Sequence, residues 1–376
     1  MTAAEVQKSL DKLALGSPIE CRDGLICLLN AIQKGGTSAG TAADLVAPSV
    51  SQRVIEALEQ HSGNSAVQRW GAATLEELFQ RSAVRGDMTC HAVSALVAGA
   101  RANLEAIEVQ RWCFSALACS LTVCGEEEDA SDSNVLAMHM LEHDAMTLIA
   151  SSIQLHERSP SLLECAVSLI SCMIMEGGDA AADEAFRTGC LSSILSTLAR
   201  TLDPEDDELG NSLAGDAALQ QACLRALWAI CESNGELGVT EIAANDGIES
   251  IVSILAQDKG NADVHKWCAS LLQSMLAQGG DLVAESAMLF KAAESLVASI
   301  ALFRTHVEVI ERCAAALATL AAYGPDAAVS VLEAGGLCAV EEAAELHGLD
   351  GSLGHWYHAL QEAIEHCTDT DEDLSP

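Results

Sequence analysis

The chain has 376 residues, of which only 3% are aromatic and 6 are proline, and its 19 Lys and Arg against 55 Asp and Glu give a net charge of −36. The composition favours helices over sheets, because β-branched and aromatic strand formers are scarce. The charge argues against nucleic acid and bare membrane as ligands, since both present negative charge. Basic protein segments are better candidate partners, although acidity that serves solubility alone explains the charge equally well.

The chain carries no sign of export or membrane insertion. It contains no stretch of about 18 uncharged apolar residues, and its first residues lack the basic and apolar regions of a signal peptide. Its 15 cysteines sit inside apolar helical patterns, so we expect reduced thiols rather than disulfides. We therefore expect a cytoplasmic or nuclear protein that is not secreted.

One helix pattern recurs along the chain. Residues 67–75, 109–117 and 264–272 are near copies of one another, and further copies begin at Ile19, Leu162, Leu219, Val309 and Leu353. Counting from the first residue of each copy as position zero, position four holds Gly71, Cys113, Ala166, Cys223, Cys268, Cys313 and Tyr357. Positions zero, four, seven, eight and eleven share one sector of a helix, so they predict a buried face. Self-similarity at a period in the 40s predicts a repeat protein.

A second helix recurs between these copies. It is aligned at Ser49, His91, His143, Gly189, Gly247, Lys291 and Gly335. Glycine at three of these starts predicts a sharp break from a short preceding helix, which we place at 179–186, 239–244 and 326–332. The repeated unit is thus a short helix, a turn, a second helix and a long third helix.

This pattern, nearly uninterrupted from 239 to 342, resembles the armadillo repeat family. The resemblance implies an all-α, right-handed superhelical α-solenoid of about seven to eight armadillo-type three-helix repeats. The related two-helix HEAT repeat is the minor alternative. We expect a lead-in helix or tail at 1–18, a single solenoid at 19–367 and an acidic disordered tail at 368–376.

Two of the intervals between successive copies of the third helix are longer than the usual mid-40s of residues. The extra residues fall in acidic, turn-rich segments near 125–133 and 202–216. Such segments predict exposed insert loops. Their acidic residues include Glu126, Glu127, Glu128, Asp206, Asp207 and Glu208.

Two short motifs resemble catalytic ones. The sequence from His139 to His143 matches H-x-x-E-H, but that zinc-binding geometry needs one continuous helix, and His143 falls at the expected helix junction. The sequence from Gly36 to Gly40 matches G-x-S-x-G, but a helical pattern precedes it instead of the required strand. No phosphate-binding loop and no C-x-x-C pair is present. We therefore predict no enzyme site, no metal and no cofactor.

Four tryptophans, Trp70, Trp112, Trp267 and Trp356, occupy position three of the third helix. Positions three, six and ten form a stripe beside the buried sector, and in the armadillo family the third helices line a concave groove that binds peptides or partner helices. The resemblance implies a partner-binding groove at Trp70, Trp112, Ser115, Arg225, Trp267, Ser270 and Ser274. An equally weighted alternative is that each indole only packs against the next repeat.

One family function is disfavoured. Nuclear-import adaptors of this family repeat a Trp and an Asn one turn apart on the third helix, and no repeat here carries that pair; Trp228 lies off the stripe. The predicted function is a non-catalytic scaffold or adaptor that binds a partner protein in the groove, with acidic loops favouring basic segments. The alternatives are a structural subunit of a large assembly and, less favoured, a chaperone or transport receptor. The sequence does not specify the oligomeric state.

Overall fold

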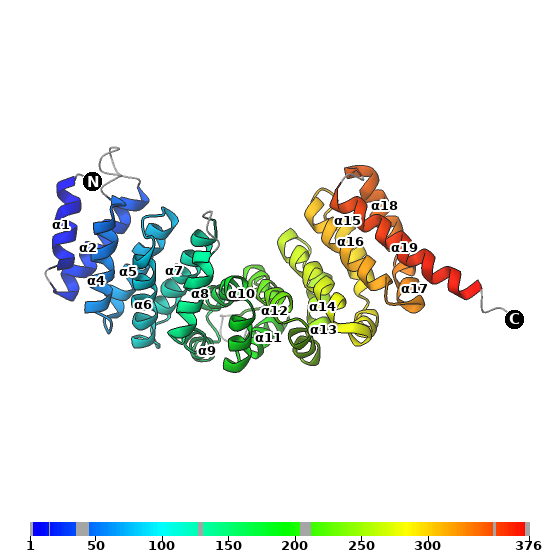
Figure 1. Cartoon of the computed structure of the whole chain (residues 1–376), viewed down its shortest axis with the longest axis horizontal. Helices are drawn as coiled ribbons and strands as arrows, with labels where there is room; N and C mark the ends of the chain where they lie inside the picture. The colour runs from blue at the N-terminus through cyan, green and yellow to red at the C-terminus, as the bar shows by residue number, and fades with distance from the viewer. Residues whose placement is uncertain are drawn as a thin grey trace. The chain divides into compact units, whose positions relative to one another are not determined.

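The computed structural model describes residues 3–14, 16–34, 45–126, 131–203, 212–348 and 351–372, and within these ranges it contains helices and no strand (Figure 1). The helices group into two compact units, Met1–Ser193 and Ile194–Pro376. The predicted all-α solenoid fold is confirmed, because each unit is built by stacking the same helical repeat.

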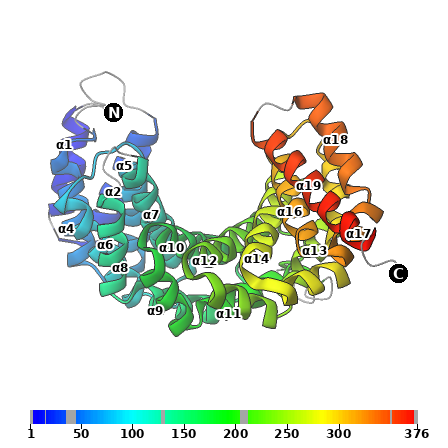
Figure 2. The same cartoon turned by 45° about the vertical axis from the view of Figure 1, so that its right-hand side comes forward.

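In the first unit, third helices form one layer and second helices form another. The helices are α1 (Ala3–Ala14), α2 (Pro18–Gln33), α4 (Pro48–Gln60), α5 (Ser65–Gln80), α6 (Asp87–Ala102), α7 (Ile107–Glu126), α8 (Ser131–Glu142), α9 (Ala145–Leu155) and α10 (Pro160–Thr188). The third helices α2, α5, α7 and α10 pack each against the next, and the second helices α4, α6 and α9 pack in the same order beside them (Figure 2). Helix α1 covers the free side of α2.

The second unit repeats this arrangement, and α11 (Cys190–Arg200) leads into it. Its helices are α12 (Ala217–Ala244), α13 (Gly247–Gln257), α14 (Ala262–Leu289), α15 (Ala292–Leu302), α16 (Val307–Ala321), α17 (Pro325–Glu333), α18 (Gly336–His347) and α19 (Ser352–Glu372). The third helices α12, α14, α16 and α19 pack in sequence, and α13, α15 and α18 form the second layer. Helix α19 continues to Glu372, through the first part of the segment that we expected to be a disordered tail.

Three long helices contain a glycine kink that joins a third helix to the first helix of the next repeat. The kinks lie at Gly178, Gly235 and Gly280, whose φ angles are 56°, 30° and 64°. A residue with a Cβ is strained at such angles, whereas glycine is not. Each glycine stands sixteen residues after position zero. The predicted short helices at 179–186 and 239–244 therefore exist as the second parts of α10 and α12.

The junction before five of the second helices, α9, α11, α13, α15 and α18, uses one residue in the left-handed region, although that residue is not always glycine. The residues are Asp144, Gly189, Asp246, Lys291 and Gly335, with φ between 54° and 78°. At 246–247 the left-handed residue is Asp246, so the free backbone predicted at Gly247 is wrong. Gly247 is needed for space instead, because a Cβ there would lie 2.6 Å from the Ile242 carbonyl oxygen.

Positions four and eight of the third helices form the predicted buried face. Cys113, Cys223, Cys268 and Cys313 are fully buried, and burial raises the pKa of the Cys113 and Cys313 thiols to about 12. These cysteines are therefore protonated packing residues. At the same position Gly71 permits close helix contact, because a Cβ there would lie 2.4 Å from Leu58 Cδ2.

Helix α10 is long and apolar enough to cross a membrane by length and composition alone. Of its apolar window, 56% is buried inside the protein, where α10 packs against α7, α8 and α9. A core helix has the same composition, so this property by itself is weak support for a membrane span.

Candidate functional site

The third-helix face carries a repeated pair of a basic residue followed by tryptophan. The pairs are Arg69 with Trp70 on α5, Arg111 with Trp112 on α7 and Lys266 with Trp267 on α14. The cationic groups lie 5.0, 4.6 and 5.8 Å from the ring centroids, within the range of cation–π attraction. All three indoles are half-buried, so part of each ring faces solvent. The face thus presents flat aromatic surfaces with a fixed positive charge beside each.

In the first unit, an ion pair ties the basic residue to the next repeat. Glu108, just before position zero of α7, lies 3.4 Å from Arg69 and 3.0 Å from Arg111. The hydrogen bond from Arg111 lowers the pKa of Glu108, so this carboxylate stays ionised. The groups are partly exposed, so the pair contributes little stability and mainly orients the guanidinium groups over the indoles.

The second unit repeats this ion pair on α14. Lys266 lies 2.9 Å from Asp263 on its own helix and 3.3 Å from Glu308 on the next third helix. These hydrogen bonds raise the pKa of Lys266, chiefly the bond to Asp263. The same three-part arrangement of tryptophan, cation and inter-repeat carboxylate therefore occurs in both units.

A half-buried carboxylate lies between α5 and α7. Ser115 donates to Glu76 Oε1 at 2.9 Å, and the Cys119 thiol contacts the Glu76 carbonyl oxygen at 3.8 Å. Burial raises the pKa of Glu76, while the bond from Ser115 lowers it. The other carboxylate oxygen, Oε2, is buried and has no hydrogen-bond partner in the structure. The predicted stripe at positions three, six and ten does not include Glu76. Glu76 is at position nine, which points toward the neighbouring helix.

The second unit brings Trp228 and Trp267 together. Their ring centroids are 5.4 Å apart, although Trp228 lies off the predicted stripe on its own helix. Position nine of α12 reaches toward position three of α14, as Glu76 reaches toward α7. The position of a residue along its own helix does not predict the contact between Trp228 and Trp267, because that contact depends on how adjacent helices pack.

The remaining predicted groove residues of the second unit differ in accessibility. Ser270 and Ser274 are buried, and Ser274 donates to the Glu232 carboxylate at 2.6 Å. Arg225 on α12 is half-buried, and its Nε has no hydrogen-bond partner in the structure. The two serines therefore support the helix contact, whereas Trp267 and Arg225 offer contact surface.

Five of the six acidic residues named for the predicted insert loops lie outside the described residues. Glu127, Glu128, Asp206, Asp207 and Glu208 lie there, and Glu126 is the last residue of α7. The G-x-S-x-G motif at 36–40 also lies outside them.

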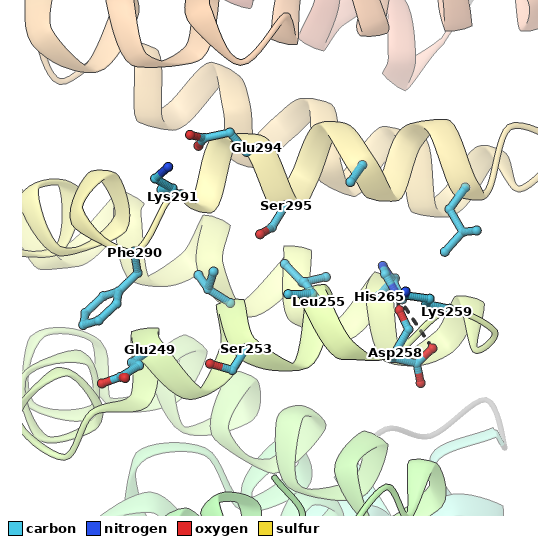
Figure 3. A pocket seen from close by; sticks show the side chains of 14 residues that line it. Glu249, Ser253, Leu255, Asp258, Lys259, His265, Phe290, Lys291, Glu294 and Ser295 are labelled. Carbon is cyan, nitrogen blue, oxygen red and sulfur yellow. Dashed lines mark hydrogen bonds and ion pairs between the residues drawn. The ribbon is translucent and has the colours of Figure 1, made fainter.

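The second unit contains a cavity of about 620 Å³ between α13 and α15 (Figure 3). His265 and Asp258 line one end, and Phe290 and Lys291 line the other. His265 Nδ1 lies 2.8 Å from Ser299 Oγ and its Nε2 lies 3.1 Å from the Asp258 carbonyl oxygen. Burial lowers the pKa of His265, so its ring is neutral.

His265 resembles a catalytic histidine in its partners but occupies a structural position. In the first unit the same position one holds Gln68 and Gln110, whose amides donate to carbonyl oxygens at the end of the preceding second helix, at 2.8 and 2.7 Å for the shorter bonds. Ser299 is itself buried, and its single hydroxyl proton is shared between His265 Nδ1 and the Ser295 carbonyl oxygen, which lies 2.8 Å from Ser299 Oγ. The trio therefore fastens α14 to the end of α13 and to α15.

The H-x-x-E-H motif does not form one continuous helix. Helix α8 ends at Glu142, and His143 lies in the turn before the left-handed Asp144. Within the described ranges, no group of three His, Cys, Asp or Glu side chains is arranged to hold a metal ion. The prediction that this motif is a repeat junction is consistent with that geometry.

A scan of protein-family models gives no match, and a search of curated protein sequences also gives none. Among solved structures, a designed armadillo repeat protein in complex with the peptide (KR)4 matches with a TM-score of 0.55 and 18% identity, over 72% of this chain and 99% of that one. Computationally designed armadillo repeat proteins for modular peptide recognition match at 0.53 and 19%, over 72% and 98%.

A structure from work on the interaction between cadherin and beta-catenin matches with a TM-score of 0.63 and 14% identity, over 96% of this chain and 66% of that one. At such identities the likeness concerns the fold alone, and that fold is an armadillo-like repeat.

Proposed function

Because the chain has an armadillo-like repeat fold, we propose that it is a non-catalytic scaffold or adaptor that binds a partner protein on its third-helix face. The observation that carries this proposal is the repeated unit of tryptophan, cation and inter-repeat carboxylate on α5–α7 and α14–α16. Similar structures in this fold include a designed protein bound to a peptide. Half-buried indoles held in one orientation lose little freedom on binding, so they suit a contact surface.

The partner segment we propose is a peptide or helix that places apolar or aromatic side chains against the indoles. The net charge of −36 favours basic residues in the flanking parts of that segment, where the acidic inserts near 125–133 and 202–216 would attract them. We place this interaction in the cytoplasm or nucleus. The designed relative bound to (KR)4 supports a basic segment by analogy of fold.

The test compares the wild-type chain with a Trp112→Ala, Trp267→Ala variant in affinity purification from the native source. Trp356→Ala is the matched control, because Trp356 occupies position three of α19 but follows His355 instead of Arg or Lys. We expect a partner that binds the wild type and the control to be lost from the double variant. Circular dichroism checks that the variants remain helical. Retention of every partner with unchanged affinity by a folded double variant refutes the third-helix assignment.

A structural subunit of a large assembly is the second candidate function. It is favoured by two exposed leucines on the last part of α14, Leu282 and Leu289, which are 77% and 75% exposed. They stand seven residues apart and so lie on one side of the helix. Ionic strength separates the two functions, because capture of a basic segment weakens at high salt, whereas an apolar interface does not.

A further inference from the structure

Two histidines, one on α8 and one in the turn after it, point their Nε2 atoms at a single hydroxyl on α6. Ser94 Oγ lies 2.9 Å from His139 Nε2 and 3.3 Å from His143 Nε2. The centroids of the two imidazole rings are 4.5 Å apart, and the ring planes meet at 68°. We propose that His139 and His143 together bind a divalent transition-metal ion of the zinc class through these two nitrogens.

The Ser94 hydroxyl occupies the point that both imidazole nitrogens face, and its own hydrogen bonding leaves their lone pairs available to a cation. The hydroxyl has one proton, and the Cys90 carbonyl oxygen, 3.0 Å away, accepts it as readily as either imidazole does. When Ser94 donates to that carbonyl, lone pairs of both Nε2 atoms can face the same point without a donor. A cation that takes the place of the Ser94 hydroxyl at that point satisfies both nitrogens at once.

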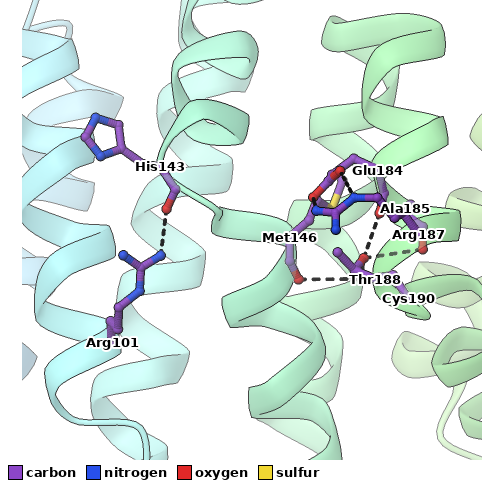
Figure 4. Close-up of polar contacts among 8 residues, drawn as sticks. All are labelled: Arg101, His143, Met146, Glu184, Ala185, Arg187, Thr188 and Cys190. Atoms are coloured by element: carbon purple, nitrogen blue, oxygen red, sulfur yellow. Dashed lines mark hydrogen bonds and ion pairs between the residues drawn. The ribbon is translucent and has the colours of Figure 1, made fainter.

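Two neighbouring groups lie beside the histidines, one near the His139 ring and one on the His143 backbone. The Glu142 carboxylate lies 4.0 Å from His139 Nδ1, the side from which a carboxylate usually orients a metal-binding histidine. Arg101 on α6 donates to the His143 carbonyl oxygen at 2.7 Å and so fastens the turn after α8 (Figure 4). The backbone of His143 is therefore fixed by a contact that does not involve the ion.

The ligand set indicates the kind of ion. Imidazole nitrogen suits Zn²⁺, Ni²⁺, Co²⁺ and Cu²⁺ and not the oxygen-seeking Mg²⁺ or Ca²⁺. Because the described residues offer no third His, Cys, Asp or Glu, water must complete the coordination. The His139 side chain is 24% exposed, so water reaches the site. We infer an exchangeable ion and not a structural one, since structural zinc sites have four protein ligands.

This site is independent of the proposed partner binding. It lies on α6, α8 and the turn after α8, whereas the indoles lie on the third helices α5, α7 and α14. It also differs from a zinc protease site, because Glu142 faces His139 Nδ1 instead of a metal-bound water.

The test is isothermal titration of the full-length reduced protein with Co²⁺ at pH 7.5, with absorption spectra of the same samples. The test variants are His139→Gln and His143→Gln, since glutamine keeps a hydrogen bond toward Ser94 and preserves the helix. His91→Gln is the matched control, because His91 is an exposed histidine on α6. The spectra exclude the cysteines as ligands when no thiolate-to-cobalt charge-transfer band appears.

We expect one site in the wild type and the control, and an affinity at least about tenfold lower in each test variant. Ser94→Ala removes the competing hydroxyl and leaves both lone pairs, so we expect it to bind the ion at least as tightly as the wild type. The proposal is overturned if the wild type binds no ion, if the folded test variants bind as tightly as the wild type, or if the ligands prove to be thiolates.

Discussion

His265 fastens the second unit at the point where α13 ends, and its replacement gives a sharp test of that role. The variant His265→Ala removes the imidazole from a buried site at one end of the cavity, where the side chain is 1% exposed. It leaves the Asp258 carbonyl oxygen and the Ser299 hydroxyl without their partner. The variant His265→Gln restores the residue that occupies the same position in α5, α7 and α12.

The expected size of the effect follows from these contacts. Losing two buried hydrogen bonds and filling the site with a methyl group costs on the order of 2–4 kcal/mol. The glutamine can still donate to Asp258, so His265→Gln should cost less than about 1.5 kcal/mol. Alanine at this position should therefore destabilise the second unit much more than glutamine does.

Acidification should separate the wild type from the glutamine variant. Burial lowers the pKa of His265 in the folded protein, so below the ordinary histidine pKa of about 6.5 the unfolded chain takes up a proton that the folded chain resists. The stability of the wild type therefore falls as the pH drops below about 6.5, by at most about 1.4 kcal/mol per pH unit, until the folded pKa is reached. His265→Gln lacks this proton and should lose less stability over the same range.

The assay is hydrogen–deuterium exchange of peptides from α13 and α14, measured at pH 7.5 and pH 5.5 with correction for the intrinsic rates. A local readout is preferable, because long repeat arrays need not unfold in one step. Equal protection of the alanine and glutamine variants at pH 7.5, or an identical pH response in the wild type and the glutamine variant, would contradict the assigned role.

Three further outcomes are expected. Gly99→Ala should lower the melting temperature, because a Cβ at Gly99 would lie 1.8 Å from Gln68 Oε1. Overpacking of this kind costs about 1–3 kcal/mol of folding stability. An unchanged melting temperature would show that the Gln68 side chain can move aside. Glu76→Gln should be neutral or stabilising in urea unfolding at pH 7, because burial raises the pKa of Glu76 and its charged form therefore destabilises the fold above pH 4.5. Ser115→Ala, which removes the hydrogen bond to Glu76, should be destabilising. A strongly destabilised Glu76→Gln variant would mean that the charge of Glu76 is needed. Alkylation of the folded protein should modify the exposed thiols and spare the buried ones, as measured by mass spectrometry. Early modification of the buried thiols would contradict their assigned place in the core. Among the cysteines whose side chains the structure describes, Cys27 and Cys338 are exposed, and the buried ones to follow are Cys113, Cys223, Cys268 and Cys313.

The helical repeat was readable from the sequence because one helix carries its own period. Each of the eight predicted copies of the third helix coincides with an observed helix, from α2 to α19, and positions four and eight are buried from Gly71 to Leu317. The kinks were also visible in principle, since Gly178, Gly235 and Gly280 share one position of the repeat. Periodicity along one helix is a local property, so it survives without knowledge of the neighbours.

The contacts between helices depended on the tertiary structure. The stripe at positions three, six and ten included Ser270 and Ser274, which are buried, and omitted Glu76 and Trp228, which reach the next repeat. These contacts depend on the separation and angle of adjacent helices, which the residues of one helix do not specify.

The sequence alone therefore determined the fold class, the repeat period and the buried face, since these follow from helix geometry and the hydrophobic effect. Only the tertiary structure decided which side chains meet. It placed Trp228 against Trp267, Arg69 against Glu108, and both His139 and His143 against Ser94. The physical reason is that each such contact joins two helices, and its geometry is a property of their packing.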